Sequence, residues 1–330
     1  EFRRVLFRSH ITGGSSSGSG AAVAARATFG ALGSDTGGSV RLPASLCGVT
    51  GLKVTYGRVS RAGAMPLSYS MDTIGPLART ALDCALMLQA LAGTDPRDPT
   101  TPAQPVPDYA ARLSQPLANL RVGIPNQFFH DDVDPAIARC IDEARRTLSG
   151  LGCKIVAVDI PDMRAAEVAA THLIAAEAAT LHGNWLRTRP GDYSPQVRAR
   201  LMRGLALPAS RYIDALRLRG ELLQRFLSDV FDKVDVLHVP TLAIQTPTLA
   251  ETDVGGGSGM DRILALLTRL QRPFNFLGLP SIALPCGDSS AGTPVGMQIA
   301  GRPFAEDVIL QSAHAFQQTT DWHTRRPAPV

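Results

Sequence analysis

Apolar positions recur along the chain with two periods, and these periods predict alternating helices and strands. The clearest helix lies at 134–150, where Asp134 serves as N-cap and Pro135 occupies the first helical position. Its apolar stripe, spaced by three and four, consists of Ile137, Cys140, Ile141, Ala144 and Leu148. Apolar runs at 120–124 and 153–160 flank this helix, which predicts a β-α-β unit.

The same periods predict elements along the rest of the chain. Further helices are expected at 21–29, 81–91 with Thr80 and Asp83 as a capping pair, 163–185, 195–205, 210–230, 261–276 as far as Pro273, and 305–318. Further strands are expected at 49–54, 234–239, 281–284 and 296–300. The proline-rich stretch 93–108 reads as a surface loop, and the glycine-rich stretch 255–259 as a mobile loop over an active site or an ordinary connection. This alternation predicts a single α/β domain with a mixed sheet covered by helices on both faces.

Composition supports a globular domain and narrows the classes of partner. The chain has 330 residues, of which 45% are apolar, enough for a sizeable core. A formal net charge of +4 gives no electrostatic footprint for nucleic acid. No apolar stretch reaches the ~18 residues of a membrane span, so no membrane partner is expected.

The five cysteines argue for a reducing compartment. Their number is odd, their spacing fits no metal site, and each lies in an apolar context. They are Cys47, Cys84, Cys140, Cys153 and Cys286. We therefore expect a cytoplasmic protein with no metal and no cofactor, although a signal peptide stays an open alternative. The scattered histidines, including His182, His238, His314 and His323, have no paired spacing and read as core or surface residues.

Two glycine-rich turns, at 13–20 and 33–39, carry the candidate chemistry. Glycine lets several backbone N–H groups converge on one oxygen, and a serine in such a turn can act as a nucleophile. Each turn alone has another interpretation: the first could be a flexible linker, and the second a plain turn. Residues 14–18 also match G-x-S-x-G, the nucleophile elbow of α/β-hydrolases, but that motif needs a buried strand before it, and 8–12 is a poor strand.

The two turns are part of a longer pattern. The segments 13–80, 235–241, 272–280 and 292–303 strongly resemble the amidase signature family of serine hydrolases. The resemblance implies amide hydrolysis through a Ser–cis-Ser–Lys triad, with Ser39 as nucleophile, Ser15 as the bridging serine and a cis peptide at or just before Ser15. It implies an oxyanion hole formed by the backbone amides of the second turn: Thr36, Gly37, Gly38 and Ser39.

Three neighbouring residues are candidates for a supporting role. Ser16 either hydrogen-bonds the site or solvates its turn, together with Ser17 and Ser19. Asp35 and Arg41 flank the nucleophile, and we interpret them as a structural ion pair or turn cap that holds the loop.

One departure from the family concerns the lysine of the triad. The family places it well upstream of the first serine turn, whereas this chain contains only Lys53, Lys154 and Lys233. None of these has the expected context, and Lys53 matches a position interpreted as structural. We therefore expect an N-terminally truncated, inactive and poorly stable chain. Residues 1–9 read as a translated library scar, which leaves 10–330 as the amidase domain.

The expected partner is a small-molecule amide, and a homo-oligomer is compatible with the sequence. The nearest alternative is the A subunit of the glutamine-dependent aminoacyl-tRNA amidotransferase. That protein has an aspartate where this chain has Thr268, and an aspartate before glycine where this chain has His182. Arg200 lies near one of its substrate-gripping arginines, so the alternative stays open, as does a non-catalytic homologue.

Overall fold

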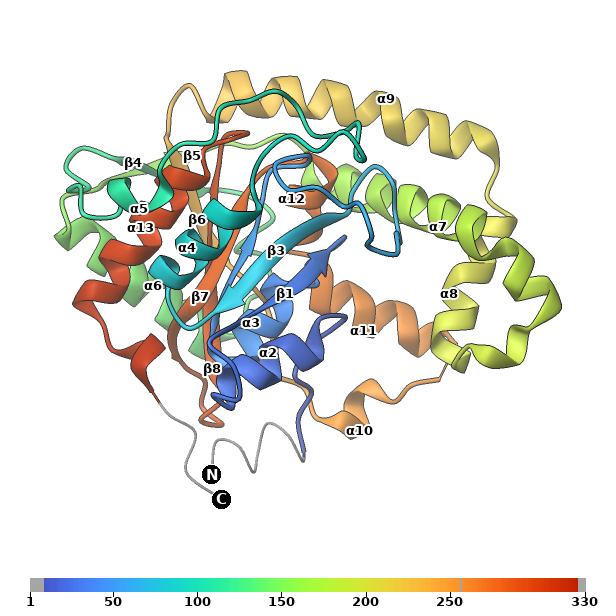
Figure 1. Cartoon of the computed structure of the whole chain (residues 1–330). Coiled ribbons are helices and arrows are strands. Elements are labelled where there is room, and N and C mark those ends of the chain that lie inside the picture. Colours follow the sequence, from blue (N-terminus) through green and yellow to red (C-terminus); the bar gives the residue numbers. More distant parts are fainter. Residues whose placement is uncertain (1–8, 256, 326–330) are drawn as a thin grey trace.

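A single mixed sheet forms the centre of the computed structural model, which describes residues 9–255 and 257–325 (Figure 1). In these residues the sheet has eight strands in the order β1-β3-β2-β7-β8-β6-β4-β5. Their bounds are β1 Gly30–Asp35, β2 Thr50–Lys53, β3 Thr73–Ala78, β4 Arg121–Pro125, β5 Lys154–Val158, β6 Val236–Pro240, β7 Ser281–Asp288 and β8 Pro294–Gly301. β4 runs parallel to β5 and β6, and the other pairs are antiparallel, which confirms the mixed sheet.

Both faces of the sheet are covered, and β8 shows why. Its residues alternate between the two faces, as the pleat of a strand requires. Met297 and Ile299 pack into the core under α4 (Ala81–Leu91), α6 (Pro135–Gly150) and α13 (Glu306–Thr319). Gln298 points to the opposite face, where it accepts a hydrogen bond from Arg41 at the start of α3 (Arg41–Cys47).

The helices with clear periodicity form where the sequence predicts them. The stripe of α6 is buried in full, and its N-cap Asp134 accepts from the Ala136 N–H. Thr80 caps α4 by accepting from the Asp83 N–H. Helices α8 (Pro195–Leu205), α7 (Met163–Thr188) and α13 (Glu306–Thr319) also match, and α9 (Ala209–Arg225) continues into a π-turn at Phe226–Val230.

The helix expected at 21–29 forms, but its bounds are shifted towards the N-terminus. Helix α2 covers Ser17–Ala24 and stops before Arg26, which has a positive φ of 59°. Residues 30–35 then form β1, whose sequence GALGSD lacks the β-branched residues typical of strands. Pairing with β3 along its whole length decides this conformation instead. Neither β1, β3 nor α3 was expected from the sequence.

The segment 255–276 also differs from its prediction. Helix α11 (Ser258–Thr268) begins inside the expected loop, Gly256 lies outside the described residues, and α12 (Arg272–Phe276) is a separate helix. The remaining short helices are α5 Tyr109–Arg112 and α10 Leu249–Thr252. Of the predicted scar at 1–9, residues 1–8 lie outside the described residues, and the Ser9 carbonyl accepts from the Leu249 N–H.

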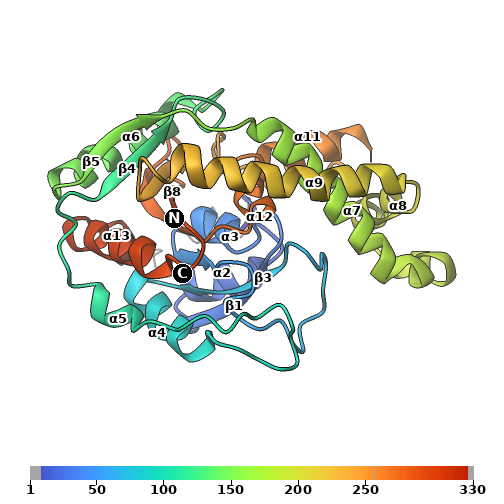
Figure 2. The same cartoon turned by 90° about the horizontal axis from the view of Figure 1, so that it is seen from above.

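Helices α7, α8 and α9 extend beyond the sheet as an arm (Figure 2). The first half of α7 packs on the core through Ala166, Ala170 and Leu173. Its second half carries α8, which lies across from α11 (Figure 1). This arm leaves a hollow between itself and the body of the molecule, next to the start of α12.

Candidate active site

The two serine turns meet at the end of β1. The Ser16 N–H donates to the Ser39 carbonyl at 3.3 Å, and the Ser16 hydroxyl donates to the Ser34 carbonyl at 3.3 Å. Gly33 makes this approach possible, because a Cβ at that position would lie 2.6 Å from the Ser16 Oγ. The peptide bond between Gly14 and Ser15 is cis, as the resemblance implies. No strand precedes this turn in the described residues, so the context of an α/β-hydrolase elbow is missing.

The turn that carries Ser39 is held by the carboxylate of Asp35. This carboxylate accepts from the N–H groups of Gly38 (2.7 Å), Val40 (3.2 Å) and Arg41 (3.4 Å). It also pairs with the Arg41 side chain, whose Nε lies 3.0 Å away, and both side chains are fully buried. Burial alone raises the pKa of Asp35, but the Arg41 guanidinium overrides it and holds the pKa of that carboxyl well below its ordinary value. Asp35 and Arg41 therefore form a buried ion pair, and Asp35 also caps the turn.

Two further side chains and one backbone carbonyl complete the surroundings of Arg41, and the sequence analysis gave these residues no role. Asn275 accepts from Arg41 and donates to Asp35 at 2.8 Å. Gln298 accepts from Arg41 at 2.8 Å, and the Gln271 carbonyl does so at 3.0 Å. Asn275 and Gln298 lie in the two C-terminal segments that carry the family resemblance. Their position in these segments is the sequence feature that could have indicated a role for them.

The predicted oxyanion turn needs one amendment. The Gly38 N–H is already bonded to Asp35, and Gly38 has a φ of +119° that favours glycine. The N–H groups of Thr36, Gly37 and Ser39 have no acceptor among the described residues. The Thr36 hydroxyl donates to Asp72 at 2.5 Å, which fixes the other end of the turn. Three of the four N–H groups of this turn are therefore unengaged among the described residues.

None of the three lysines donates to Ser15 in the part of the chain that the structure describes. Lys53 is fully buried, and its Nζ donates to the carbonyls of Leu279 (2.8 Å) and Val54 (3.1 Å). Burial, aided by the positive charge of Arg41, lowers the pKa of Lys53 to about 7. Lys154 and Lys233 are exposed, and Lys154 begins β5, the edge strand farthest from β1 in the sheet.

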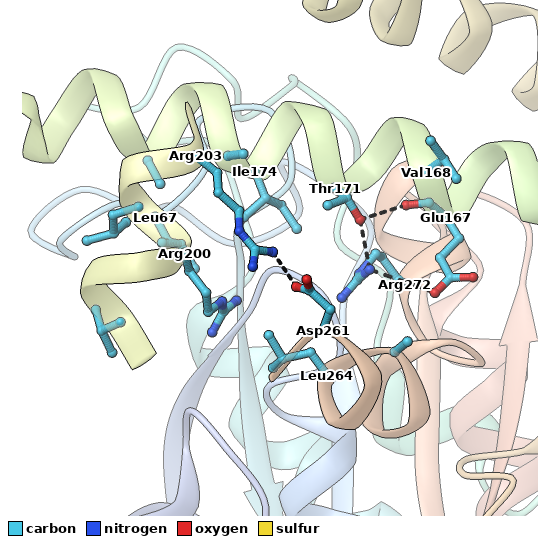
Figure 3. Close-up of a pocket in the computed structure, with 15 residues that line it drawn as sticks. Leu67, Glu167, Val168, Thr171, Ile174, Arg200, Arg203, Asp261, Leu264 and Arg272 are labelled. Atoms are coloured by element: carbon cyan, nitrogen blue, oxygen red, sulfur yellow. Dashed lines mark hydrogen bonds and ion pairs between the residues drawn. The ribbon is translucent and has the colours of Figure 1, made fainter. Parts of the chain in front are cut away.

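A cavity of about 460 Å³ lies beside the turn at 36–39, between α7, α8 and α11 (Figure 3). A Cβ on Gly37 would lie 3.7 Å from the Arg272 Nε and 3.9 Å from the Ile174 Cδ1, and both of these side chains line the cavity. The rest of the wall is largely apolar, with Val168, Ala175 and Leu264 among its residues. The cavity therefore offers a substrate-sized space next to Gly37, although neither Ser15 nor Ser39 is among its lining residues.

The described residues contain neither a metal-binding cluster nor a membrane-spanning helix. Within 9–255 and 257–325 no cluster of three or more His, Cys, Asp or Glu side chains could hold a metal ion. No helix in these ranges is long and apolar enough to cross a bilayer. His182 bonds the Tyr193 hydroxyl, and His238 is buried.

Comparisons with known proteins show the family of this chain. A family model described as Amidase matches residues 6–310. The chain is 41% identical to the A subunit of glutamyl-tRNA(Gln) amidotransferase from Methylococcus capsulatus, over 97% of this chain and 70% of that protein. It is similar to a solved chain from a vestigial protein complex described as revealing the evolutionary origins of an s-triazine catabolic enzyme, with 36% identity, a TM-score of 0.85, and 94% and 67% of the two chains covered. It is also similar to 6-aminohexanoate cyclic dimer hydrolase, with 30% identity, a TM-score of 0.85, and 97% and 70% covered.

Proposed function

Because the chain belongs to the Amidase family, we propose that Ser39 is the nucleophile of an amide hydrolase and that Ser15 relays its proton. The Ser39 Oγ forms a bond to the amide carbonyl carbon while the N–H groups of Thr36, Gly37 and Ser39 hold the developing oxyanion. The C–N bond then breaks, and the amine leaves with the proton that passed through Ser15. Water cleaves the resulting ester, which releases a carboxylic acid and restores Ser39.

The observation that carries this proposal is the contact between the two serine turns. The bond from the Ser16 N–H to the Ser39 carbonyl brings Ser15 beside the turn with three unengaged amides. Asp35 binds the backbone of that turn and is itself paired with Arg41, and we propose both as positioning residues. Preorganised donors of this kind typically contribute about 10²–10³-fold each to acyl transfer.

We further propose that none of the three lysines acts as the base of the triad. Lys53 uses its Nζ to bridge two backbone carbonyls, a structural role that agrees with the sequence analysis. A serine without a base stays protonated at neutral pH and is a weak nucleophile. The 330-residue chain is therefore expected to hydrolyse amides slowly, and a lysine upstream of Gly13 is expected to supply the base.

A fluorophosphonate probe tests the assignment of the nucleophile. Slow labelling that maps to Ser39 and disappears in Ser39→Ala is expected. Ser45→Ala is the matched control, because Ser45 is buried in α3 and should not react. Labelling at Ser16 with Ser39 untouched would contradict the proposal. Absence of labelling in any form of the protein, including one extended upstream of Gly13, would favour a non-catalytic homologue.

The second candidate function is release of ammonia from glutamine, which the name of the Methylococcus capsulatus relative favours. The surroundings of Thr268 disfavour it. The resemblance described above implies an aspartate at this place in the amidotransferase subunit, for the glutamine amino group, whereas here the Thr268 hydroxyl accepts from the Arg272 guanidinium at 2.5 Å. A cation at this place repels an ammonium group. We therefore expect glutamine to be a poorer substrate than simple aliphatic or aryl amides, and equal rates would contradict this.

The partner of the site is accordingly proposed to be a small-molecule amide, with no cofactor. We also propose a reducing, cytoplasmic location, because all five cysteines are buried and unpaired.

A further inference from the structure

We propose that the cavity beside Gly37 is an anion subsite and that Arg272 makes the enzyme selective for amides whose acyl part ends in a carboxylate. This inference rests on the proposed function, because it takes Ser39 and its turn as the reacting centre. It names the substrate class from the charges of the cavity rather than from the serine chemistry.

Positive charge exceeds negative charge in the cavity wall. Three arginines and two carboxylates line it: Arg200, Arg203, Arg272, Glu167 and Asp261. Arg203 is ion-paired with Asp261, and Figure 3 shows Arg200 and Arg272 on either side of that pair. The side chain of Arg200 makes no hydrogen bond or ion pair with the residues that the structure describes. One positive charge in a largely apolar space is thus left without a partner.

Arg272 is the better placed of these two arginines. Its side chain is only 11% exposed, and its Nε is buried without a hydrogen-bond partner. The Thr171 hydroxyl accepts from one terminal nitrogen at 2.9 Å and the Thr268 hydroxyl from the other. Arg272 also forms an ion pair with Glu167, but at 3.9 Å this pair is too long for a hydrogen bond and leaves the Nε–H unused. Burial lowers the pKa of Arg272 only to about 10, so the guanidinium stays charged at neutral pH.

The position of Arg272 specifies which half of the substrate carries the anion. Its Nε lies close to Gly37, whose N–H is proposed to hold the carbonyl oxygen. The leaving amine must face Ser15, from which it collects its proton. A group that reaches Arg272 therefore belongs to the acyl side and is joined to the carbonyl by a short linker. A carboxylate suits this role, because a planar guanidinium with a free N–H binds carboxylates strongly.

Three anilides with the same two-carbon acyl linker test the proposal. They end in a carboxylate, a carboxamide and an ammonium group: N-phenylsuccinamic acid, its primary amide, and β-alanine anilide. Binding to the 330-residue chain is measured by isothermal titration calorimetry, which needs no catalytic turnover. The carboxylate is expected to bind roughly 10- to 100-fold more tightly than the carboxamide, and the ammonium compound most weakly.

Matched variants assign the preference to Arg272. Arg272→Gln is expected to remove the preference for the carboxylate, and Arg272→Lys to keep part of it. Arg198→Gln, on the same helix as Arg200 but outside the cavity, should leave it unchanged. If Arg272→Gln does not fold, Arg200→Gln, at an exposed position, takes its place and should weaken the preference several-fold.

Equal binding of the three anilides, no binding of any, or a preference that survives Arg272→Gln would overturn the anion subsite. None of these results changes the fluorophosphonate labelling of Ser39, so the two proposals fail separately. Conversely, a carboxylate preference without labelling would keep the subsite and remove the nucleophile.

Discussion

The two serine turns are fixed in the fold by different forces. The turn before Ser39 is held by buried charge, since Asp35 accepts from three backbone N–H groups and pairs with Arg41. The turn that carries Ser15 is tied to its surroundings by neutral hydrogen bonds, two through Ser16 at 3.3 Å and one from the Ser19 hydroxyl to the Leu32 carbonyl at 2.7 Å, and Ser15 itself is exposed. The difference shows that the Ser39 turn is fixed by a buried ion pair, whereas the Ser15 turn is fixed by weaker, partly exposed contacts.

This contrast has an energetic consequence. Removal of one partner of a buried ion pair leaves an uncompensated charge in a medium of low dielectric constant. Loss of a neutral, partly exposed hydrogen bond costs far less, because water replaces the lost partner. Substitutions in the two turns should therefore differ in size and in what they change.

The largest effect is expected for Asp35→Ala. The substitution leaves the buried Arg41 guanidinium without its counter-charge and removes the acceptor of three backbone N–H groups. The free energy of unfolding should therefore fall by about 3–5 kcal/mol. Chemical denaturation monitored by circular dichroism measures this. Asp214→Ala is the control, since Asp214 and Arg217 form an exposed pair at 3.9 Å and should contribute less than about 1 kcal/mol. Equal losses in the two variants would show that the turn is not held by Asp35.

Gly38→Ala should have the second largest effect. Alanine is strained at a φ of +119°, and its Cβ would lie 2.2 Å from the Gln271 Oε1. The Gln271 amide can move aside, but the backbone strain of about 1–3 kcal/mol stays. Gly18→Ala in the first turn is the control, because a Cβ there meets nothing within 4 Å, and it should be neutral or stabilising. Comparison of the two melting temperatures tests the contrast between the turns directly.

The sequence predicted those parts of the molecule that depend on local pattern. Helix α6 begins and ends as expected because its cap, its first proline and its apolar stripe all lie within one segment. The ion pair between Asp35 and Arg41 was predictable for the same reason, since its partners are six residues apart. The roles of Ser15 and Ser39 came from family resemblance and stay proposals.

What the sequence missed depends on contacts between distant segments. Strand β1 has a poor intrinsic propensity and forms because β3 pairs with it. Asn275 reaches Asp35 across 240 residues of chain, which no local pattern indicates. The hydrogen bond from the Gly38 N–H to Asp35 likewise depends on the three-dimensional position of the Asp35 carboxylate, which the sequence does not give.

A pH series tests whether Lys53 is a buried structural lysine. Its pKa is lowered to about 7 in the folded chain, against about 10.4 when unfolded, so between these values the unfolded chain binds more protons. Stability should therefore rise with pH in this window, by roughly 1–2 kcal/mol between pH 7 and 8.5. Lys53→Met should flatten that rise, which denaturation at several pH values measures. An unchanged slope in the variant would mean that Lys53 is not the group responsible.

The smallest effect, and the one that best separates structure from chemistry, is expected for Ser16→Ala. The variant loses the hydrogen bond to the Ser34 carbonyl, which should cost about 0.5–1.5 kcal/mol. Ser19→Ala loses a comparable bond to the Leu32 carbonyl at 2.7 Å, and serves as the matched control. The two variants should be similar in stability, but only Ser16 lies against the Ser39 turn. Fluorophosphonate labelling of Ser39 should therefore slow in Ser16→Ala and stay unchanged in Ser19→Ala. If both variants label at the wild-type rate, the Ser16 side chain has no role in positioning the nucleophile, and its contact with Gly33 is packing alone.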